Sequence, residues 1–266
     1  MPDKIALITG ATSGIGAAYA KKFAEYGYDL ILSGRRKEKI ESFAGTIRET
    51  YHVAVEVVIS ELSEKDGIQK VIDQIQGRPV EVLVNNAGFG ANSLYQDCDL
   101  EVMERLAKVN VLAPMEIIRA VLPGMVQRNS GTIINISSES VYMSVPKNSV
   151  YAGAKAFLKT FTEGLAMDVY GTGVKVMAVC PGLTHTDFHE KMGMDKSRQV
   201  NRGAVRWMSP EDIVNVSLQD LAKNRIVSIP GLHTKVLTMF LNLMPRKTYY
   251  RFLYNFSQKN FAKKAD

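Results

Sequence analysis

Seven short runs rich in β-branched and other apolar residues recur along the chain, and longer amphipathic segments separate them. Several of these runs are apolar throughout, which is typical of strands that are covered on both faces. Strands in alternation with helices predict an α/β fold with a mostly parallel sheet. The predicted strands are Ile5–Thr9, Leu30–Ser33, Val53–Ile59, Val80–Val84, Thr132–Ile136, Lys175–Val179 and Arg225–Ile229.

The organisation along the chain indicates one large domain. Of the 266 residues, 46% are hydrophobic and 23% are charged, as in ordinary globular proteins. No internal repeat, low-complexity tract or Pro/Gly/Ser-rich linker divides the sequence. We therefore predict one domain over residues 1–230 and a basic, aromatic-rich extension over residues 231–266.

The first predicted strand leads into the sequence TGATSGIG, and the helical segment Ile15–Tyr26 follows. Glycines here let the backbone turn sharply, approach a ligand and pack the helix against the strand. The amides and the positive end of the helix would then face a pyrophosphate. A βα turn with incidental glycines is the alternative. We predict a Rossmann-type, doubly wound fold whose dinucleotide contacts include Gly10, Thr12, Ser13, Gly14, Ile15 and Gly16.

The end of the second predicted strand indicates which dinucleotide is bound. A dinucleotide fold that holds NAD usually has Asp or Glu there, on the adenosine 2′-hydroxyl. This chain has Gly34, Arg35 and Arg36 instead. Glycine leaves space for a 2′-phosphate, and arginine offers it charge-assisted hydrogen bonds. The pattern favours NADP(H), held by Arg35 or Arg36, and a solvated basic helix start is the alternative.

Small and polar residues also follow the fourth and sixth predicted strands. Glycine and alanine let a flat ring or a ribose come close to the backbone. A threonine hydroxyl could meet a cofactor amide or phosphate, or it could cap a helix. The predicted cofactor contacts are Asn86, Ala87 and Gly88 after the fourth strand, and Pro181, Gly182 and Thr184 after the sixth.

The segment from Ser138 to Lys155 carries the residues expected to perform the chemistry. Tyr151 and Lys155 are four apart in a helix-like run, so the phenol and the ammonium share one face. A nearby cation lowers the pKa of a tyrosine from about 10, which gives an acid and base usable near neutrality. Ser138 could reach the same substrate oxygen. A surface pair is the alternative, because about one Tyr-x-x-x-Lys is expected by chance.

Five motifs in order resemble the short-chain dehydrogenase/reductase family over roughly residues 3–230. They are TGATSGIG, NNAG, Asn110, Ser138 with Tyr151-x-x-x-Lys155, and PG with Thr184. The resemblance implies NAD(P)-linked interconversion of a carbonyl and an alcohol in a compact single domain. It further implies roles for four residues: Tyr151 as acid and base, Ser138 polarising the carbonyl, Lys155 holding the nicotinamide ribose and lowering the tyrosine pKa, and Asn110 supporting a proton-relay water.

Two of these positions have an open alternative. Asn110 is polar within an apolar helical run, where a structural role that distorts the helix competes with the catalytic one. Glu61 and Leu62 are expected beside the adenine, where the family more often has Asp-Leu. The longer Glu61 side chain leaves that adenine contact open.

Apolar residues near the predicted acid indicate a lipophilic ketone or oxoacyl substrate, although a nonspecific apolar lining is the alternative. These residues are Val141, Tyr142, Met143 and Val145 before the tyrosine, and Phe188, Met192 and Met194 in a predicted lid. His185 and His189 have helical metal spacing with Glu190, but the order inverts HExxH, so we predict no metal. A nucleotide-binding regulator without turnover is the second functional class, and the presence of all the catalytic residues favours the enzyme.

The composition and the charge of the chain predict the cellular location of the protein and its partners. The only cysteines are Cys98 and Cys180, so we expect a reducing compartment. A strand and a glycine turn in residues 1–10 leave no room for a signal peptide, and the apolar stretch Val236–Met244 is shorter than the ~20 residues of a membrane span. We expect a cytoplasmic homodimer or homotetramer that binds no nucleic acid.

The C-terminal extension is strongly basic. Residues 223–266 contain nine Lys or Arg and the single acid Asp266, which gives a net charge of +8. Because the whole chain has a net charge of +6, residues 1–222 have a net charge of −2. Four apolar residues recur there at helical spacing: Tyr249, Phe252, Leu253 and Phe256. Packing over the substrate entrance or on a partner subunit is one interpretation. The other is a peripheral contact with an anionic membrane.

Overall fold

The computed structural model describes residues 4–143, 146–192, 195, 197, 199–201 and 206–261, without the side chains of His189, Lys191 and residues 256–261. Seven strands form one sheet in the order β3-β2-β1-β4-β5-β6-β7, and every neighbouring pair is parallel. The seven predicted strands and the Rossmann-type sheet are therefore confirmed. The strands are β1 (Ile5–Thr9), β2 (Asp29–Gly34), β3 (Val55–Ile59), β4 (Val80–Asn85), β5 (Gly131–Ile136), β6 (Val174–Val179) and β7 (Val227–Ser228).

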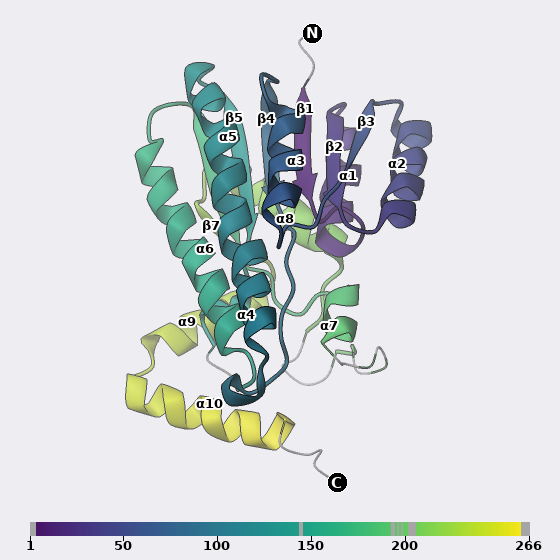
Figure 1. Cartoon of the computed structure of the whole chain (residues 1–266). Helices are drawn as coiled ribbons and strands as arrows, with labels where there is room; N and C mark the ends of the chain where they lie inside the picture. Colours follow the sequence, from purple (N-terminus) through teal and green to yellow (C-terminus); the bar gives the residue numbers. More distant parts are fainter. Residues whose placement is uncertain are drawn as a thin grey trace.

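Helices cover both faces of this sheet, and each face has its own hydrophobic core (Figure 1). On one face lie α1 (Gly14–Glu25), α2 (Lys37–Tyr51) and α8 (Pro210–Ala222). On the other lie α3 (Lys65–Ile75), α5 (Ala113–Gln127) and α6 (Ser149–Asp168), with α4 (Leu100–Ala107) leading into α5. This double cover explains why the predicted strands are apolar throughout, since every residue of β1 is buried.

Helix α4, a π-helical segment η2 (Lys108–Leu112) and α5 form one continuous helical run. The run Leu100–Gln127 has 28 residues and contains an 18-residue window with a mean hydropathy of 1.4, a length and composition that could also cross a membrane. In the fold, 44% of its apolar window is buried, and Ile117 and Met125 belong to the core against the sheet. We therefore describe it as a core helix.

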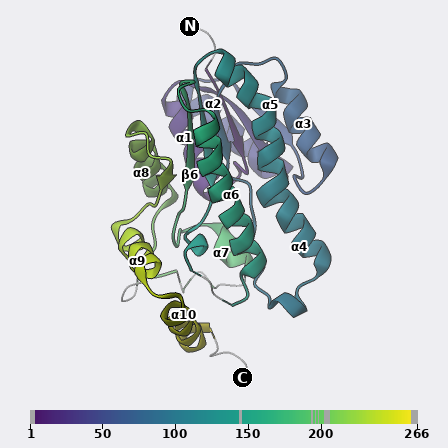
Figure 2. The same ribbon diagram turned by 90° about the vertical axis from the view of Figure 1, so that its left-hand side faces the viewer.

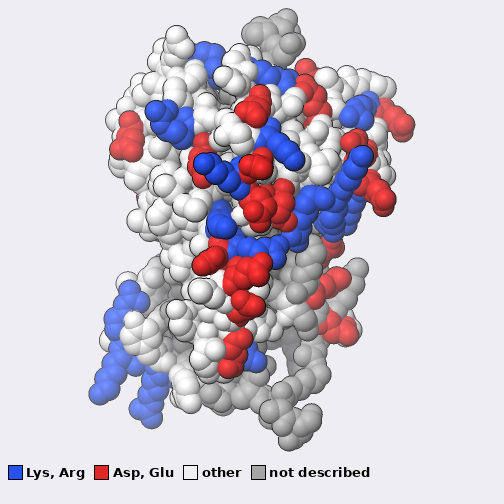
Figure 3. Space-filling model, in the orientation of Figure 1, with Lys and Arg blue, Asp and Glu red and all other residues white. Residues whose placement is uncertain are grey.

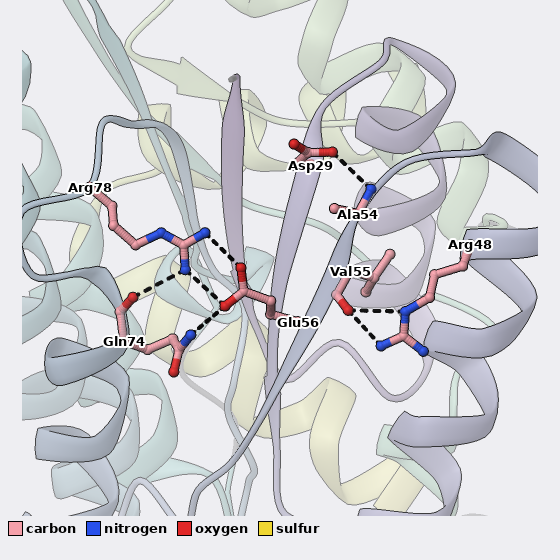
Figure 4. Close-up of polar contacts among 7 residues, drawn as sticks. All are labelled: Asp29, Arg48, Ala54, Val55, Glu56, Gln74 and Arg78. Atoms are coloured by element: carbon pink, nitrogen blue, oxygen red, sulfur yellow. Dashed lines mark hydrogen bonds and ion pairs between the residues drawn. The ribbon is translucent and has the colours of Figure 1, made fainter. Parts of the chain in front are cut away.

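The edge strand β3 is held by side chains from neighbouring segments (Figure 4). Arg48 of α2 donates from Nε to the carbonyl of Val55 at 3.1 Å. Arg78, which follows α3, forms a two-pronged ion pair with Glu56, with Nη2 to Oε1 at 2.7 Å and Nη1 to Oε2 at 2.9 Å. Such contacts occupy polar groups of an edge strand that could otherwise pair with another chain.

The carboxyl ends of all seven strands point to the same end of the molecule. Five further elements lie at that end, of which Figures 1 and 2 label α7, α9 and α10: η1 (Tyr95–Asp97), η3 (Glu139–Val141), α7 (Asp187–Lys191), α9 (Leu232–Leu243) and α10 (Arg246–Phe261). The strand order reverses between β1 and β4, and in open α/β sheets ligands bind in the crevice at such a point. The predicted boundary at residue 230 falls between β7 and α9, and the division into two parts stays a prediction.

A chain of buried hydrogen bonds fixes α6 against the middle of the sheet. Asn85 Nδ2 on β4 donates to Asn135 Oδ1 on β5 at 2.9 Å. Asn135 Nδ2 then donates to Thr162 Oγ1 at 2.9 Å, and this hydroxyl donates to the carbonyl of Leu158 at 2.6 Å. Asn135 and Thr162 are fully buried, so neither strand nor helix can shift without breaking these bonds.

We predict that Asn135→Leu lowers the free energy of unfolding by about 2 kcal/mol, because it leaves buried polar partners on β4 and α6 unpaired. Urea denaturation measures the difference. Asn215→Leu, on the exposed side of α8, is the matched control and should change stability little. Equal stability of the two variants would contradict the structural role of this hydrogen-bond chain.

Candidate active site

A cavity of about 250 Å³ lies at the carboxyl edge of the sheet, between the first βα turn, the ends of β2 to β6 and the start of α6. Most of the predicted site residues line it: Gly10, Thr12, Ser13, Gly14, Ile15, Arg35, Arg36, Glu61, Leu62, Asn86, Ala87, Gly88, Ser138, Tyr151, Lys155, Pro181, Gly182 and Thr184. Gly16 and Asn110 lie behind its wall, against Asn86 and Gly88 respectively. The structure thus brings together residues that are up to 174 positions apart, from Gly10 to Thr184.

Sequence reasoning missed several lining residues, among them Ser33, Ser60, Phe89, Gly90, Val109, Ile136, Ser137 and Thr186. Ser60 and Ser137 directly follow β3 and β5. Their place after a strand end was a usable signal, because all carboxyl ends of a parallel sheet meet at one edge. The hydroxyls of Ser33 and Ser60 are 2.7 Å apart and hydrogen-bonded, which closes the cavity between β2 and β3.

The glycine turn has the geometry that the sequence motif predicts. Gly10 and Gly14 have φ of +66° and +58°, a backbone region that other residues rarely adopt. A Cβ on Gly10 would lie 2.8 Å from Cα of Ala87, and one on Gly16 would collide with Asn86. Asn86 Nδ2 donates to the carbonyls of Thr9 and Gly10, at 3.1 and 3.0 Å. At Gly16, glycine is therefore needed for packing against Asn86, and a ligand contact there stays a prediction.

The two arginines after β2 make different contacts. Arg36 Nη2 donates to Thr12 Oγ1 at 2.6 Å and to Ser13 Oγ at 3.1 Å, directly beside the glycine turn. Its guanidinium also lies 3.6 Å from a carboxylate oxygen of Asp187 at the start of α7. Arg35 Nη1 donates to Glu61 Oε2 at 3.0 Å. Both guanidinium groups line the cavity, as a site for a phosphate requires.

Glu61 uses its longer side chain to hold local structure. Its Oε1 accepts hydrogen bonds from the amide and the hydroxyl of Ser63, at 3.2 and 3.0 Å. Partial burial alone would raise the pKa of Glu61, but the hydrogen bonds from Arg35 and Ser63 outweigh it and lower this pKa. The carboxylate is therefore occupied by Arg35 and Ser63, and an adenine contact at Glu61 stays a prediction.

Helix α6 brings Tyr151 and Lys155 to the inner end of the cavity, opposite Ser138 at the end of β5. The side chains are buried, with 8% exposure for Tyr151 and 3% for Lys155. Lys155 Nζ donates to the carbonyl of Ile136 at 2.8 Å and lies 5.8 Å from the centre of the Tyr151 ring. The phenol is hydrogen-bonded to Ser138. The three predicted catalytic groups are therefore adjacent.

Burial dominates the protonation of this cluster. It raises the pKa of Tyr151 to about 12, although the hydrogen bond with Ser138 acts in the opposite direction and nearby Glu139 adds to the rise. Burial also lowers the pKa of Lys155 to about 8. The predicted lowering of the Tyr151 pKa is thus not met, because desolvation by burial is the largest effect on this group. At neutral pH the tyrosine is a phenol, the form that donates a proton.

Asn110 combines the two alternatives that the sequence left open. It lies in the π-helical segment η2, is fully buried, and donates from Nδ2 to the carbonyls of Phe89 and Leu106, at 3.2 and 3.0 Å. Its Oδ1 has no hydrogen-bond partner among the described residues. A Cβ on Gly88 would lie 2.7 Å from this oxygen and 3.1 Å from Lys155 Nζ. An unpaired buried acceptor beside an ammonium fits a bound water or ligand hydroxyl.

An apolar wall formed by α7 closes the other side of the cavity. The rings of Phe188 and Tyr151 are 5.5 Å apart, and Phe188 and Met192 both line the cavity, which agrees with their prediction as lid residues. Asn92 Nδ2 donates to the carbonyl of Met192 at 3.0 Å and ties this wall to the loop after β4. The predicted lining residues Val145 and Met194 lie outside the described residues.

The prediction that Met143 lines the cavity is wrong, and Thr184 and His185 make other contacts nearby. Met143 packs against α9 and α10, away from the residues that line the cavity, because apolar side chains of those helices cover it. Thr184 lines the cavity, and its hydroxyl donates to the carbonyl of Gly182 at 2.9 Å. The hydroxyl that caps α7 is that of Thr186, which accepts a hydrogen bond from the amide of Phe188. The ring of His185 packs on that of Trp207 at 5.3 Å, while the side chain of His189 lies outside the described residues.

Glu139 is a half-buried acidic residue that the sequence did not indicate. It follows Ser138, and its Oε2 lies 2.8 Å from the point where a Cβ on Gly182 would be. Burial raises the pKa of Glu139 to about 7. The folded state therefore binds a proton more tightly than the unfolded chain, in which this group has its ordinary value of 4.5. Ionisation of Glu139 costs stability as the pH rises from about 4.5 to 7.

We predict that Glu139→Gln stabilises the protein at pH 8 by up to about 3 kcal/mol and has little effect at pH 5, where Glu139 is already protonated in the folded state. Urea denaturation of both proteins at the two pH values measures this. Glu41→Gln, on the exposed face of α2, is the control for loss of a carboxylate. A gain that is the same at pH 5 and pH 8 would contradict the assignment.

Comparison with known proteins agrees with this geometry. Residues 4–197 match the family model for short chain dehydrogenases. The chain is 30% identical to an uncharacterized oxidoreductase of Staphylococcus saprophyticus over 86% of its own length and 95% of that protein. It is 29% identical to the very-long-chain 3-oxoacyl-CoA reductase of Mus musculus over 95% of its own length and 79% of that protein. Among solved structures, a short-chain dehydrogenase from Sphingobium yanoikuyae in complex with NADPH has a TM-score of 0.82 and 28% identity, over 99% of this chain and 97% of that one. The chain belongs to the short-chain dehydrogenase/reductase family.

Proposed function

We propose that this protein is an NADP(H)-dependent oxidoreductase that interconverts a ketone or oxoacyl group and a secondary alcohol, with Tyr151 as acid and base. The observation that carries the proposal is the buried cluster of Ser138, Tyr151 and Lys155 in the same cavity as the glycine turn. Family membership supports carbonyl and alcohol chemistry. The cofactor, the catalytic tyrosine and the substrate class are the proposed part.

The residues present fit a dinucleotide. The glycine turn, with its positive φ angles, and the start of α1 would hold the pyrophosphate. Arg35, Arg36 or both would meet a 2′-phosphate, and Gly34 itself places no carboxylate at the end of β2. Lys155 and the unpaired Oδ1 of Asn110, both next to Gly88, would face the nicotinamide ribose and a bound water. The NADPH in the similar Sphingobium structure supports the choice of NADP(H).

The chain supplies the proton in the proposed reaction. Bound NADPH supplies a hydride to the carbonyl carbon. Tyr151, protonated at neutral pH, donates its proton to the carbonyl oxygen, and the Ser138 hydroxyl next to it hydrogen-bonds that oxygen. The Ile136 carbonyl fixes the Lys155 ammonium beside the tyrosine ring, where its charge would favour the phenolate left after proton transfer.

The substrate end of the cavity is apolar, which supports a lipophilic substrate. Phe89, Phe188 and Met192 line it next to Tyr151. Met192 is unbranched and flexible, so this wall could adapt to more than one shape. The name of the murine relative, a very-long-chain 3-oxoacyl-CoA reductase, supports an oxoacyl group.

We also propose a cytoplasmic homodimer or homotetramer. Exposed apolar side chains on the outer surface of the helical layer, such as Leu112 and Phe157, would suit a subunit contact.

A nucleotide-binding regulator is the alternative function. NADPH consumption with a panel of ketones and oxoacyl thioesters distinguishes the two, since a regulator would bind NADPH without oxidising it.

We predict that Tyr151→Phe lowers kcat about 10² to 10⁴-fold while the Kd for NADPH stays unchanged, because only the transferable proton is removed. Steady-state kinetics and cofactor titration measure the two effects. Tyr170→Phe, at a position with 86% exposure, is the matched control. Wild-type turnover in Tyr151→Phe would exclude this tyrosine as the acid and base.

We further predict that Gly34→Asp combined with Arg35→Ala shifts cofactor preference from NADPH to NADH. The new carboxylate repels a 2′-phosphate, and the loss of the guanidinium removes an attraction. A Cβ at position 34 would lie 3.0 Å from Thr12 Cγ2, so Gly34→Ala is the control that separates crowding from charge. If the wild-type protein already binds NADH as tightly as NADPH, the role assigned to the arginines is wrong.

A further inference from the structure

Helix α9 is amphipathic in an unusual sense, because its threonines face the protein and its large apolar side chains face outward. Thr234, Thr238 and Leu241 are buried. At about 100° per residue, the five most exposed apolar residues fall within roughly 100° of the helix circumference, and Leu237 (38% exposed) lies about 60° beyond them. This outer α9 stripe consists of Leu232 (78% exposed), Val236 (53%), Met239 (59%), Phe240 (55%) and Leu243 (78%).

Helix α10 is anchored to the domain by its inner face. Tyr249 and Leu253 are buried with Leu241 of α9 and with Met143. The Tyr249 hydroxyl donates to the carbonyl of Tyr142 at 3.0 Å. The inner face of α10 therefore packs on the domain, and a position over the substrate entrance or on a partner subunit stays a prediction. Of the other two residues of the predicted stripe, Phe252 is 42% exposed, and the side chain of Phe256 lies outside the described residues.

The outer face of α10 combines aromatic and basic side chains. Tyr250 and Tyr254 are 58% and 61% exposed, and Lys247 and Arg251 are exposed beside them on the same side of the helix. The sequence has no Asp or Glu between Ala222 and Ala265. Figure 3 shows Lys and Arg side chains projecting at the lower left of the molecule, where α10 begins in Figure 1.

We propose that the outer α9 stripe and the outer face of α10 form a docking surface for an anionic phospholipid bilayer. A helix that lies in a membrane interface has an apolar stripe, interfacial aromatic residues and flanking Lys or Arg. Here α9 supplies the apolar stripe, and α10 supplies the exposed tyrosines and the cations. At 12 and 16 residues they are too short to span a bilayer, so they bind parallel to its surface.

Charge favours lipid over a second copy of this chain as the occupant. In a two-fold dimer built on this surface, the basic face of α10 would approach its own copy, and the segment contains no acidic residue to neutralise it. Anionic headgroups complement the same cations, each worth roughly 1 kcal/mol near such a surface. Acyl chains at the boundary cover the apolar stripe.

The docking surface lies at the substrate end of the molecule. Thr234 Oγ1, on the inner side of α9, is 3.0 Å from the point where a Cβ on Gly182 would lie, and Gly182 lines the cavity. Tyr142, which accepts the hydrogen bond from α10, is four residues beyond Ser138. A bilayer bound to α9 and α10 would thus lie near the side of the active site that Gly182 lines. The membrane contact itself does not depend on the proposed reaction.

Sedimentation with vesicles tests the proposal. The full chain should pellet with phosphatidylglycerol vesicles at low salt, less at 0.5 M salt, and not with pure phosphatidylcholine. Phe240→Asn combined with Leu243→Asn should remove the apolar contribution and weaken binding at least tenfold. Lys247→Gln combined with Arg251→Gln should weaken binding about 30-fold at low salt. All four side chains are exposed, so the variants should fold, which thermal unfolding by circular dichroism verifies.

Matched controls remove equal charge or apolar surface elsewhere. Lys65→Gln with Lys70→Gln changes α3, and Met167→Asn with Tyr170→Asn changes the surface near the end of α6. Both should bind vesicles like the wild type. No pelleting with phosphatidylglycerol, or equal losses in control and test variants, would overturn the proposal. So would a dimer in light scattering that only the α9 variant dissociates, because the stripe would then be a subunit interface.

Discussion

The structure depends on one constraint, the parallel pairing of all seven strands in a sheet that helices cover on both faces. Parallel strands must be joined by crossovers, so every carboxyl end lies at the same edge. The loops at that edge are free to carry polar residues, whereas the strands themselves are closed to water. This is why residues from Gly10 to Thr184 line one cavity, and why the opposite end of the sheet contributes nothing to it.

Burial at this edge determines the protonation states of the ionisable side chains in the site. Helices α6 and α4 and the α7 wall exclude water from Tyr151 and Lys155. This burial raises the pKa of Tyr151 and lowers the pKa of Lys155, so the neutral form of each group is favoured. The same exclusion acts on Glu139, whose carboxyl is destabilised as an anion. A site of this kind holds an un-ionised phenol that can donate its proton. Charged groups in it are stabilised by a few fixed hydrogen-bond partners, as the Ile136 carbonyl stabilises the Lys155 ammonium.

The C-terminal helices connect this site to the surface. Their inner faces pack on the segment after Ser138, through Tyr249 and Leu253. Their outer faces carry the apolar stripe and the cations. One pair of helices thus combines a structural role near the active site with a surface suited to anionic lipid.

The sequence by itself determined the α/β alternation, the glycine turn, the arginines after β2 and the Tyr151–Lys155 pair, because each depends on local spacing or on backbone geometry. Tertiary structure decided the rest. The packing of Gly16 on Asn86, the unpaired oxygen of Asn110 beside Lys155 and the burial of Glu139 arise from segments far apart in the chain. The pKa of Tyr151 rises because desolvation is a property of the assembled cavity, which i, i+4 spacing does not report. Helical periodicity likewise predicts stripes in α9 and α10, but only packing against Met143 and Gly182 decides which face is covered and which remains exposed.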